Sequence, residues 1–146
     1  NLTRAQLTAV LYRMDGSPAV SGTCSFTDAK RGAYYADALV WAERNALVNG
    51  YGSGAFGVGD AITREQLVTI LYRYAAYKGI DVSARADLSG YRDAEKISGY
   101  ARDAFGWAVE AGLIRGSGDL LNPQGRTTRA EYAAIAARFH KTFIAK

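Results

Sequence analysis

A short repeated string constrains the fold of this chain more than any other feature. The string joins Thr, Arg, a pair of helix-forming residues and an apolar residue, and it occurs at residues 2–7, 62–67 and 127–132. Its threonines lie 60 and then 65 residues apart. A chain that repeats itself at such a period builds one small unit per repeat and buries its core by stacking the units.

A second element occurs twice, at residues 38–50 and 104–116, and contains Trp41 or Trp107. Each copy follows an aromatic-x-Asp triplet and precedes a Gly-rich stretch and a Thr-Arg string. A complete repeat is therefore aromatic-x-Asp, Trp segment, Gly-rich loop and Thr-Arg segment. The chain is predicted to hold the second half of a first repeat and two complete repeats in one structural domain, with bounds 1–15, 26–79 and 88–143.

Local signals predict that both kinds of segment are helical. Each Thr-Arg string spells a capping box, in which a Thr hydroxyl and a Gln or Glu side chain three residues on satisfy each other's backbone N–H groups. The pairs are Thr3 with Gln6, Thr63 with Gln66, and Thr128 with Glu131. Apolar residues then recur at helical spacing, whereas the glycines of residues 50–60 require turns. No alternating strand pattern occurs, so the predicted class is all-α, with tandem helix–loop–helix repeats.

Composition excludes several kinds of function. One cysteine and one histidine rule out a disulfide framework and a Cys- or His-based metal site, and leave no catalytic nucleophile–base pair. No apolar run is long enough to insert into a membrane. The net charge of +4 suggests an anionic partner, but the basic residues are too dispersed for nucleic acid. Because the chain starts without Met or a leader, we expect it to be a piece of a longer protein.

Three arginines are the strongest ligand candidates. Arg4, Arg64 and Arg129 each occupy the first helical position, where the helix dipole disfavours a cation. They lie off the apolar face, so packing does not explain them. Helix N-terminal N–H groups attract anions, and a guanidinium binds a carboxylate through two hydrogen bonds. Anion binding is the favoured interpretation, and an ion pair with an Asp of a neighbouring unit is the alternative.

Aromatic residues are the second set of candidates. Trp41 and Trp107 fall on apolar helix faces, so core packing is their default role and ligand stacking the alternative. Tyr51, in the Gly-rich loop, is the better candidate for stacking on a sugar ring. Asp28 and Asp93, of the aromatic-x-Asp triplets, are expected to accept hydrogen bonds from backbone N–H groups.

The order of these elements closely resembles the S-layer homology (SLH) domain, across nearly the whole chain. The resemblance implies a non-catalytic module without cofactor, on a secreted bacterial protein, that anchors it to the cell wall. It implies a pseudo-threefold helical body with grooves between repeats, which bind an acidic, often pyruvylated, wall polysaccharide. The ligand role then falls on Arg4, Arg64 and Arg129, with support from loop residues such as Tyr51 and Gly52 and from the neighbouring aromatics. The alternative function is a protein–protein or self-assembly module of a surface protein.

The chain departs from the family pattern in ways that matter. Gln6 and Gln66 replace the motif's Glu, and the third repeat has no aromatic at the position of Tyr51. The first half of repeat one is missing, so helix 3–14 is expected to lack its Trp-helix partner. Its apolar face would then be exposed, or covered by a second molecule through self-association.

Overall fold

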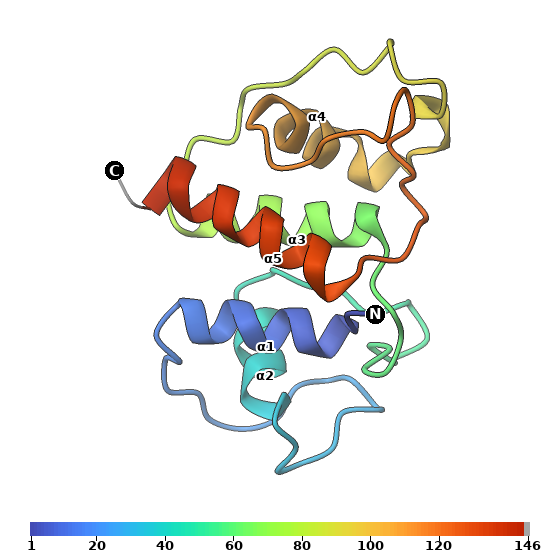
Figure 1. Ribbon diagram of the computed structural model, residues 1–146. Helices are drawn as coiled ribbons and strands as arrows, with labels where there is room; N and C mark the ends of the chain where they lie inside the picture. The colour runs from blue at the N-terminus through green and yellow to red at the C-terminus, as the bar shows by residue number, and fades with distance from the viewer. Residues whose placement is uncertain (145–146) are drawn as a thin grey trace. The chain divides into compact units, whose positions relative to one another are not determined.

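The computed structural model describes residues 1–144, which form helices joined by long irregular segments (Figure 1). Isolated bridges are the only strand-like pairing in that range, which confirms the all-α class. No helix of the described residues has the length and apolar character needed to cross a membrane. The helices are α1 (Arg4–Met14), α2 (Ala36–Arg44), α3 (Arg64–Tyr77), α4 (Arg102–Glu110) and α5 (Arg129–Phe139), with short η1 (Ala94–Lys96), η2 (Gly99–Ala101) and the π-helical η3 (His140–Ile144).

The chain divides into two compact units, an N-terminal unit of residues 2–61 and a C-terminal unit that starts at Ile62. In the N-terminal unit, α1 packs against α2 (Figure 1). The ring centroids of Tyr12 and Trp41 lie 5.5 Å apart across this contact. The indole N–H of Trp41 donates to Asp15 Oδ2 over 3.2 Å, so the polar atom of a buried ring is satisfied.

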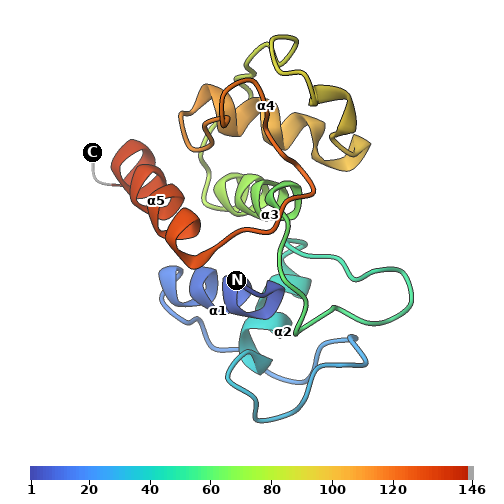
Figure 2. The same cartoon turned by 45° about the vertical axis from the view of Figure 1, so that its right-hand side comes forward.

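In the C-terminal unit, α3 packs against α4, and α5 lies on another side of α3 (Figure 2). The Tyr72 and Trp107 rings lie 5.8 Å apart, which repeats the aromatic contact of the N-terminal unit. Tyr74 contacts Phe139 of α5 at 6.1 Å between ring centroids. Two equivalent helix pairs therefore form the two units, and the C-terminal unit adds α5.

This pairing corrects one expectation from the sequence. We expected helix 3–14 to pack on the Trp helix of its own repeat, which the chain lacks. Instead α1 packs on α2 and α3 packs on α4, so each of these two Thr-Arg helices has the Trp helix of the following repeat as its partner. Leu7 and Leu11 of α1 are fully buried. The self-association expected through an uncovered face therefore loses its structural argument, and the pseudo-threefold body stays a prediction.

The aromatic-x-Asp triplets hold the Gly-rich loops in place. Asp28 accepts hydrogen bonds from the backbone N–H groups of Phe56 (2.8 Å), Gly57 (2.8 Å) and Val58 (3.0 Å). Desolvation opposes ionisation, but these hydrogen bonds outweigh it and lower the pKa of Asp28 below its ordinary value. The Asp28 carboxylate, which precedes α2 in the chain, thus holds the Gly-rich loop that follows α2.

Asp93 does the same in the C-terminal unit. It is buried and accepts from the N–H groups of Leu121 (2.8 Å) and Asn122 (2.7 Å). Here too desolvation is outweighed by backbone hydrogen bonds, and the pKa of Asp93 is lowered. Both loops are therefore built on an ionised aspartate at the same place in the repeat.

The lowered pKa of Asp93 predicts how stability depends on pH. A group whose folded-state pKa is depressed stabilises the fold above its unfolded pKa, here 3.8, and loses that contribution as pH falls through the folded pKa. The difference in thermal midpoint between wild type and Asp93→Asn should therefore be full near neutral pH and shrink below pH 3.8. Asp28→Asn should show the same dependence, because backbone hydrogen bonds lower the pKa of Asp28 in the same way. A difference in thermal midpoint that stays constant from pH 7 to about 3 would show that the ionised Asp93 carboxylate does not hold the loop.

Thr127 gives a second stability prediction. It is fully buried at the position held by Leu2 and Ile62 in the other strings, and its hydroxyl lacks a hydrogen-bond partner among the described residues. An unsatisfied buried hydroxyl costs free energy, so Thr127→Val should raise the free energy of unfolding by about 1 kcal/mol. Buried Thr69 is the control, because its hydroxyl donates to the Glu65 carbonyl oxygen over 2.7 Å and Thr69→Val should gain nothing. Denaturant titration of the three proteins decides, and equal effects of the two substitutions would refute the assignment.

Candidate functional site

The three candidate arginines all occupy the first turn of a Thr-capped helix, as the sequence predicts. Thr3 and Thr63 form complete capping boxes with the Gln three residues on. Thr128 caps α5 through its hydroxyl, which accepts from the Glu131 N–H over 3.0 Å. The same string therefore starts three helices, but the surroundings of its arginine differ each time.

Arg4 is a buried clamp for the Gly-rich loop of repeat two. Only 5% of its surface is exposed, although the sequence suggested that packing had no use for it. Its Nε donates to the carbonyl of Phe56 over 2.9 Å and its Nη2 to that of Asn49 over 3.2 Å. The guanidinium also lies 4.7 Å from the Tyr51 ring centroid and 4.6 Å from that of Phe56, within cation–π distance. Arg4 thereby orders the loop that carries the exposed aromatic.

Tyr51 is held in that loop with much of its ring exposed. Its exposed fraction is 49%, and its hydroxyl donates to Asp60 Oδ2 over 2.8 Å. Gly52 beside it is exposed and has a φ of 85°. A Cβ on Gly57 would lie 2.7 Å from the Tyr51 hydroxyl, so this turn has no room for a side chain there. The arrangement offers a partly exposed ring in a constrained loop, as stacking on a sugar requires.

Arg64 is paired with Glu131. Its Nη2 lies 2.5 Å from Glu131 Oε2, and the two side chains are 20% and 35% exposed. The backbone N–H of Arg64 donates to the carbonyl of Gly125 over 2.9 Å, at the end of the Gly-rich loop of repeat three. The pair joins the start of α3 to the start of α5, so it realises the ion-pair alternative, with Glu in place of the expected Asp.

A small pocket opens beside this pair. Its volume is about 170 Å³, and three of its lining side chains are arginines against a single carboxylate. Arg138 is held there by a hydrogen bond from its Nη1 to the Leu113 carbonyl over 3.1 Å. The pocket is therefore cationic and has room for one acidic group with part of its sugar. It is lined by Arg64, Leu113, Ile114, Arg115, Glu131, Ala134, Ile135 and Arg138.

Arg129 is the third case. It is exposed, and within residues 1–144 its side chain makes no ion pair or hydrogen bond. The first N–H groups of α1 and α3, by contrast, donate to loop carbonyls, since Arg4 N bonds Asp60 O over 2.9 Å as Arg64 N bonds Gly125 O. These two N–H groups are therefore not available to an anion, which corrects one part of the sequence argument. An anion at these sites would meet the guanidinium groups instead.

The two tryptophans do not take part in a binding surface. Trp41 is 2% exposed and Trp107 is 1% exposed, because both lie between the paired helices. A ring buried on both faces cannot stack on a sugar. The ligand role considered for them is therefore replaced by the packing role.

Glu65 is a site-building residue that the sequence argument missed. It is buried at the position of Ala5 and Ala130, and its carboxylate accepts from four donors. These are the Ser98 N–H (3.0 Å), the Ser98 hydroxyl (2.7 Å), the Tyr100 hydroxyl (3.2 Å) and the Gln124 amide (3.1 Å). The exchange of Ala for Glu within a repeated string was the visible signal. Arg115 was also missed, although it lies in the second repeated element, where it replaces the Asn49 of the first copy.

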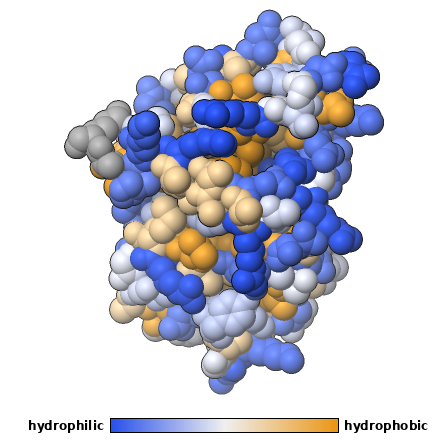
Figure 3. Space-filling view, viewed as in Figure 1, coloured by the Kyte–Doolittle hydropathy of each residue, from blue (hydrophilic) through white to orange (hydrophobic). Residues whose placement is uncertain are grey.

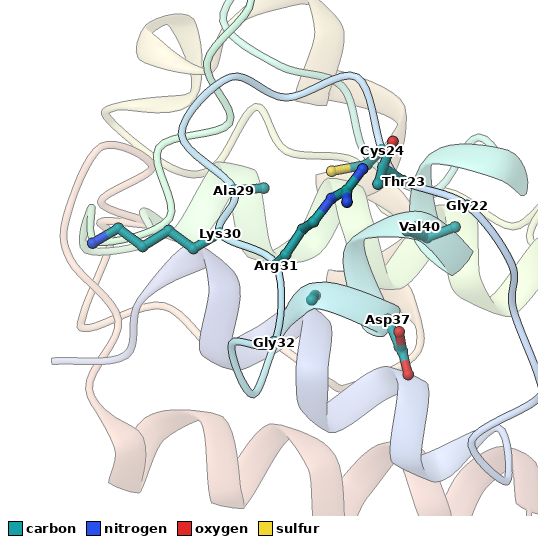
Figure 4. Close-up of a pocket in the computed structure, with 10 residues that line it drawn as sticks. Gly22, Thr23, Cys24, Ala29, Lys30, Arg31, Gly32, Asp37 and Val40 are labelled. Atoms are coloured by element: carbon teal, nitrogen blue, oxygen red, sulfur yellow. The ribbon is translucent and has the colours of Figure 1, made fainter.

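A larger cavity of about 520 Å³ lies in the N-terminal unit, between residues 22–32 and the start of α2. It contains none of the candidate ligand residues. Figure 4 shows the Lys30 side chain extending away from the other labelled residues, while Arg31 reaches toward Thr23 and Cys24.

Within the described part of the chain, no cluster of His, Cys, Asp and Glu could hold a metal ion. Hydrophilic side chains cover most of the face seen in Figure 3.

Comparison with known proteins shows what the chain resembles. The model of the S-layer homology domain matches residues 25–68 and 90–133. The chain is 32% identical over 139 residues to an amylopullulanase of Thermoanaerobacterium thermosulfurigenes, which covers 92% of this chain and 7% of that protein. It is 28% identical to the surface-layer 125 kDa protein of Lysinibacillus sphaericus, over 80% of this chain and 10% of that protein. It is 26% identical to the cellulosome-anchoring protein of Acetivibrio thermocellus, over 94% of this chain and 32% of that protein.

The chain thus spans only a small part of each of these relatives, and their names include an enzyme, a surface-layer protein and an anchoring protein. The shared segment is common to proteins of different activity, so the enzymatic name does not pass to it. The two matches to the family model fall on the two complete repeats and each ends within the Thr-Arg helix, and together they cover more than half of the chain. The chain belongs to the S-layer homology domain family.

Proposed function

We propose that this chain anchors its parent protein to the bacterial cell wall by binding an acidic polysaccharide, with pyruvate ketals as the acidic groups. The cationic pocket of Arg64, Arg115 and Arg138 is the observation that carries the proposal. A carboxylate on a sugar matches this pocket in charge, and the planar guanidinium of Arg64 can take it through two hydrogen bonds. The family places the chain outside the cell, at the cell surface.

The equivalent arginines have different parts in this proposal. Arg64, with 20% of its side chain exposed, contacts the acidic group. In the N-terminal unit, Arg4 orders the loop of Tyr51, whose exposed ring is offered for stacking on a sugar of the polysaccharide, with Gly52 keeping the turn open beside it. Arg129 is exposed and offers a guanidinium without the surrounding pocket, so it binds weakly. The module carries no catalytic role.

The names of two relatives support anchoring as the purpose of the binding. One is a surface-layer protein and one a cellulosome-anchoring protein, and both align with at least 80% of this chain. A module attached to such different proteins is useful if it fixes each of them to the same surface. The alternative, a self-assembly module, has no comparable support now that α2 covers α1.

A cell-wall pull-down tests the nature of the ligand. The chain should sediment with purified wall that retains its polysaccharide, and should stay in solution with wall from which acid has removed the polymer. The physical reason is that the fixed carboxylates are lost with the polymer, and the guanidinium groups then have no partner. Equal binding to both preparations would refute the glycan proposal and favour a protein or peptidoglycan target.

A substitution at Arg64 tests the pocket. Arg64→Ala should weaken binding to intact wall about tenfold or more, the expected loss for a charge-assisted hydrogen bond to a carboxylate. The exposed Arg102 provides the matched control, since Arg102→Ala removes the same charge elsewhere in the C-terminal unit and should bind as wild type does. The thermal midpoint should change little, because the Arg64–Glu131 pair is partly solvated. A large loss of stability with binding retained would make Arg64 a purely structural residue.

A further inference from the structure

The capping glutamines of α1 and α3 define a reference position for the side chain three residues after the Thr. Gln6 Oε1 accepts from the Thr3 N–H over 2.9 Å, and Gln66 Oε1 accepts from the Thr63 N–H over 3.0 Å. Both boxes are complete in both directions. Gln6 and Gln66 therefore both show where the side chain at this position lies when the capping box is its only partner.

Glu131 occupies the equivalent position in α5 but has left the box. The Thr128 hydroxyl accepts from the Glu131 N–H, yet among the described residues no bond joins the Thr128 N–H to the Glu131 carboxylate. Oε2 lies instead 2.5 Å from Arg64 Nη2. Oε1 stays 3.4 Å from the Thr128 hydroxyl oxygen, so the carboxylate lies between its own cap and Arg64.

The difference follows from charge. A carboxylate gains more from a guanidinium than a neutral amide does, so a Glu is drawn toward Arg64 where a Gln stays in the cap. The position in the capping box is also favourable for the Glu131 carboxylate, because there it would accept from a free N–H at the positive end of the helix dipole. The Glu131 carboxylate can therefore bind either the Arg64 guanidinium or the Thr128 N–H, and the two interactions compete.

We propose that Glu131 is an internal occupant of the Arg64 site, which the acidic group of the polysaccharide displaces. On displacement, the Glu131 side chain closes the capping box of α5, which offsets part of the lost ion pair. This inference rests on the proposed function and adds its regulation. A neutral sugar cannot replace a carboxylate on Arg64, so the competition favours acidic glycans over neutral ones and sets the affinity of this pocket.

The substitution Glu131→Gln tests the displacement. The amide keeps the volume and the capping ability that Gln6 and Gln66 show, but it is a weaker competitor for Arg64. Isothermal titration with a 4,6-O-pyruvylated hexose glycoside should give about 3- to 10-fold tighter binding than for wild type, the effect of a partly exposed ion pair. The non-pyruvylated glycoside should bind both proteins equally weakly.

The exposed Glu95 supplies the charge-matched control in the same unit. Glu95→Gln changes the net charge by the same amount and should leave the affinity at the wild-type value. Wild type that binds the acidic glycoside together with unchanged or weaker binding by Glu131→Gln would overturn the displacement and leave the proposed function intact. Failure of both wild type and Glu131→Gln to prefer the acidic glycoside would overturn the displacement and the proposed function together.

The backbone N–H of Thr128 gives a second readout. In wild type, adding the pyruvylated glycoside should move its amide proton resonance toward the position seen in unliganded Glu131→Gln, where the box is closed. The Thr63 amide, whose box is complete already, is the internal reference. A Thr128 resonance that stays unchanged while the glycoside binds would overturn the movement of Glu131.

Discussion

The joint between a Gly-rich loop and the start of the preceding repeat's Thr-Arg helix is the constraint on which the rest of the structure depends. Arg4 N donates to Asp60 O and Arg64 N to Gly125 O, each over 2.9 Å, so the joint recurs with the same geometry. On its other side each loop is held by an ionised aspartate. The loop therefore cannot leave the helix start without exposing backbone groups that are now paired.

This joint explains why each compact unit of the structure begins at a Thr-Arg string, whereas each repeat of the sequence begins half a repeat earlier, at an aromatic-x-Asp triplet. In α1 and α3, the loop of the next repeat satisfies the first N–H of the helix, and the Trp helix of that same repeat packs against it. It also explains why equal strings give unequal sites. Arg4 meets the carbonyl groups of a loop that folds over it, Arg64 meets Glu131, and Arg129 stands at the last helix start, where no further loop follows within the described residues.

The sequence alone predicted the elements well and their partners poorly. Capping residues and apolar spacing are local, so the helices that follow Thr3 and Thr63 could be placed from the string itself. The aspartates of the triplets were likewise expected to bind backbone N–H groups, although not those of the Gly-rich loops. Burial of Arg4 and the pairing of Arg64 with Glu131 depend on residues tens of positions away, which no local pattern reports. The pattern within one string could show that an arginine was unusual, but not what it would meet.

The central claim is that the Arg64 guanidinium receives an acidic group of the wall polysaccharide. Side-chain NMR of arginine-labelled protein, titrated with the soluble pyruvylated polymer, observes that group directly. The account predicts a saturable shift of the Arg64 Nε–H resonance, with smaller shifts at Arg115 and Arg138 in the same pocket and none at Arg102. An unchanged Arg64 resonance at polymer concentrations that saturate binding would contradict the account.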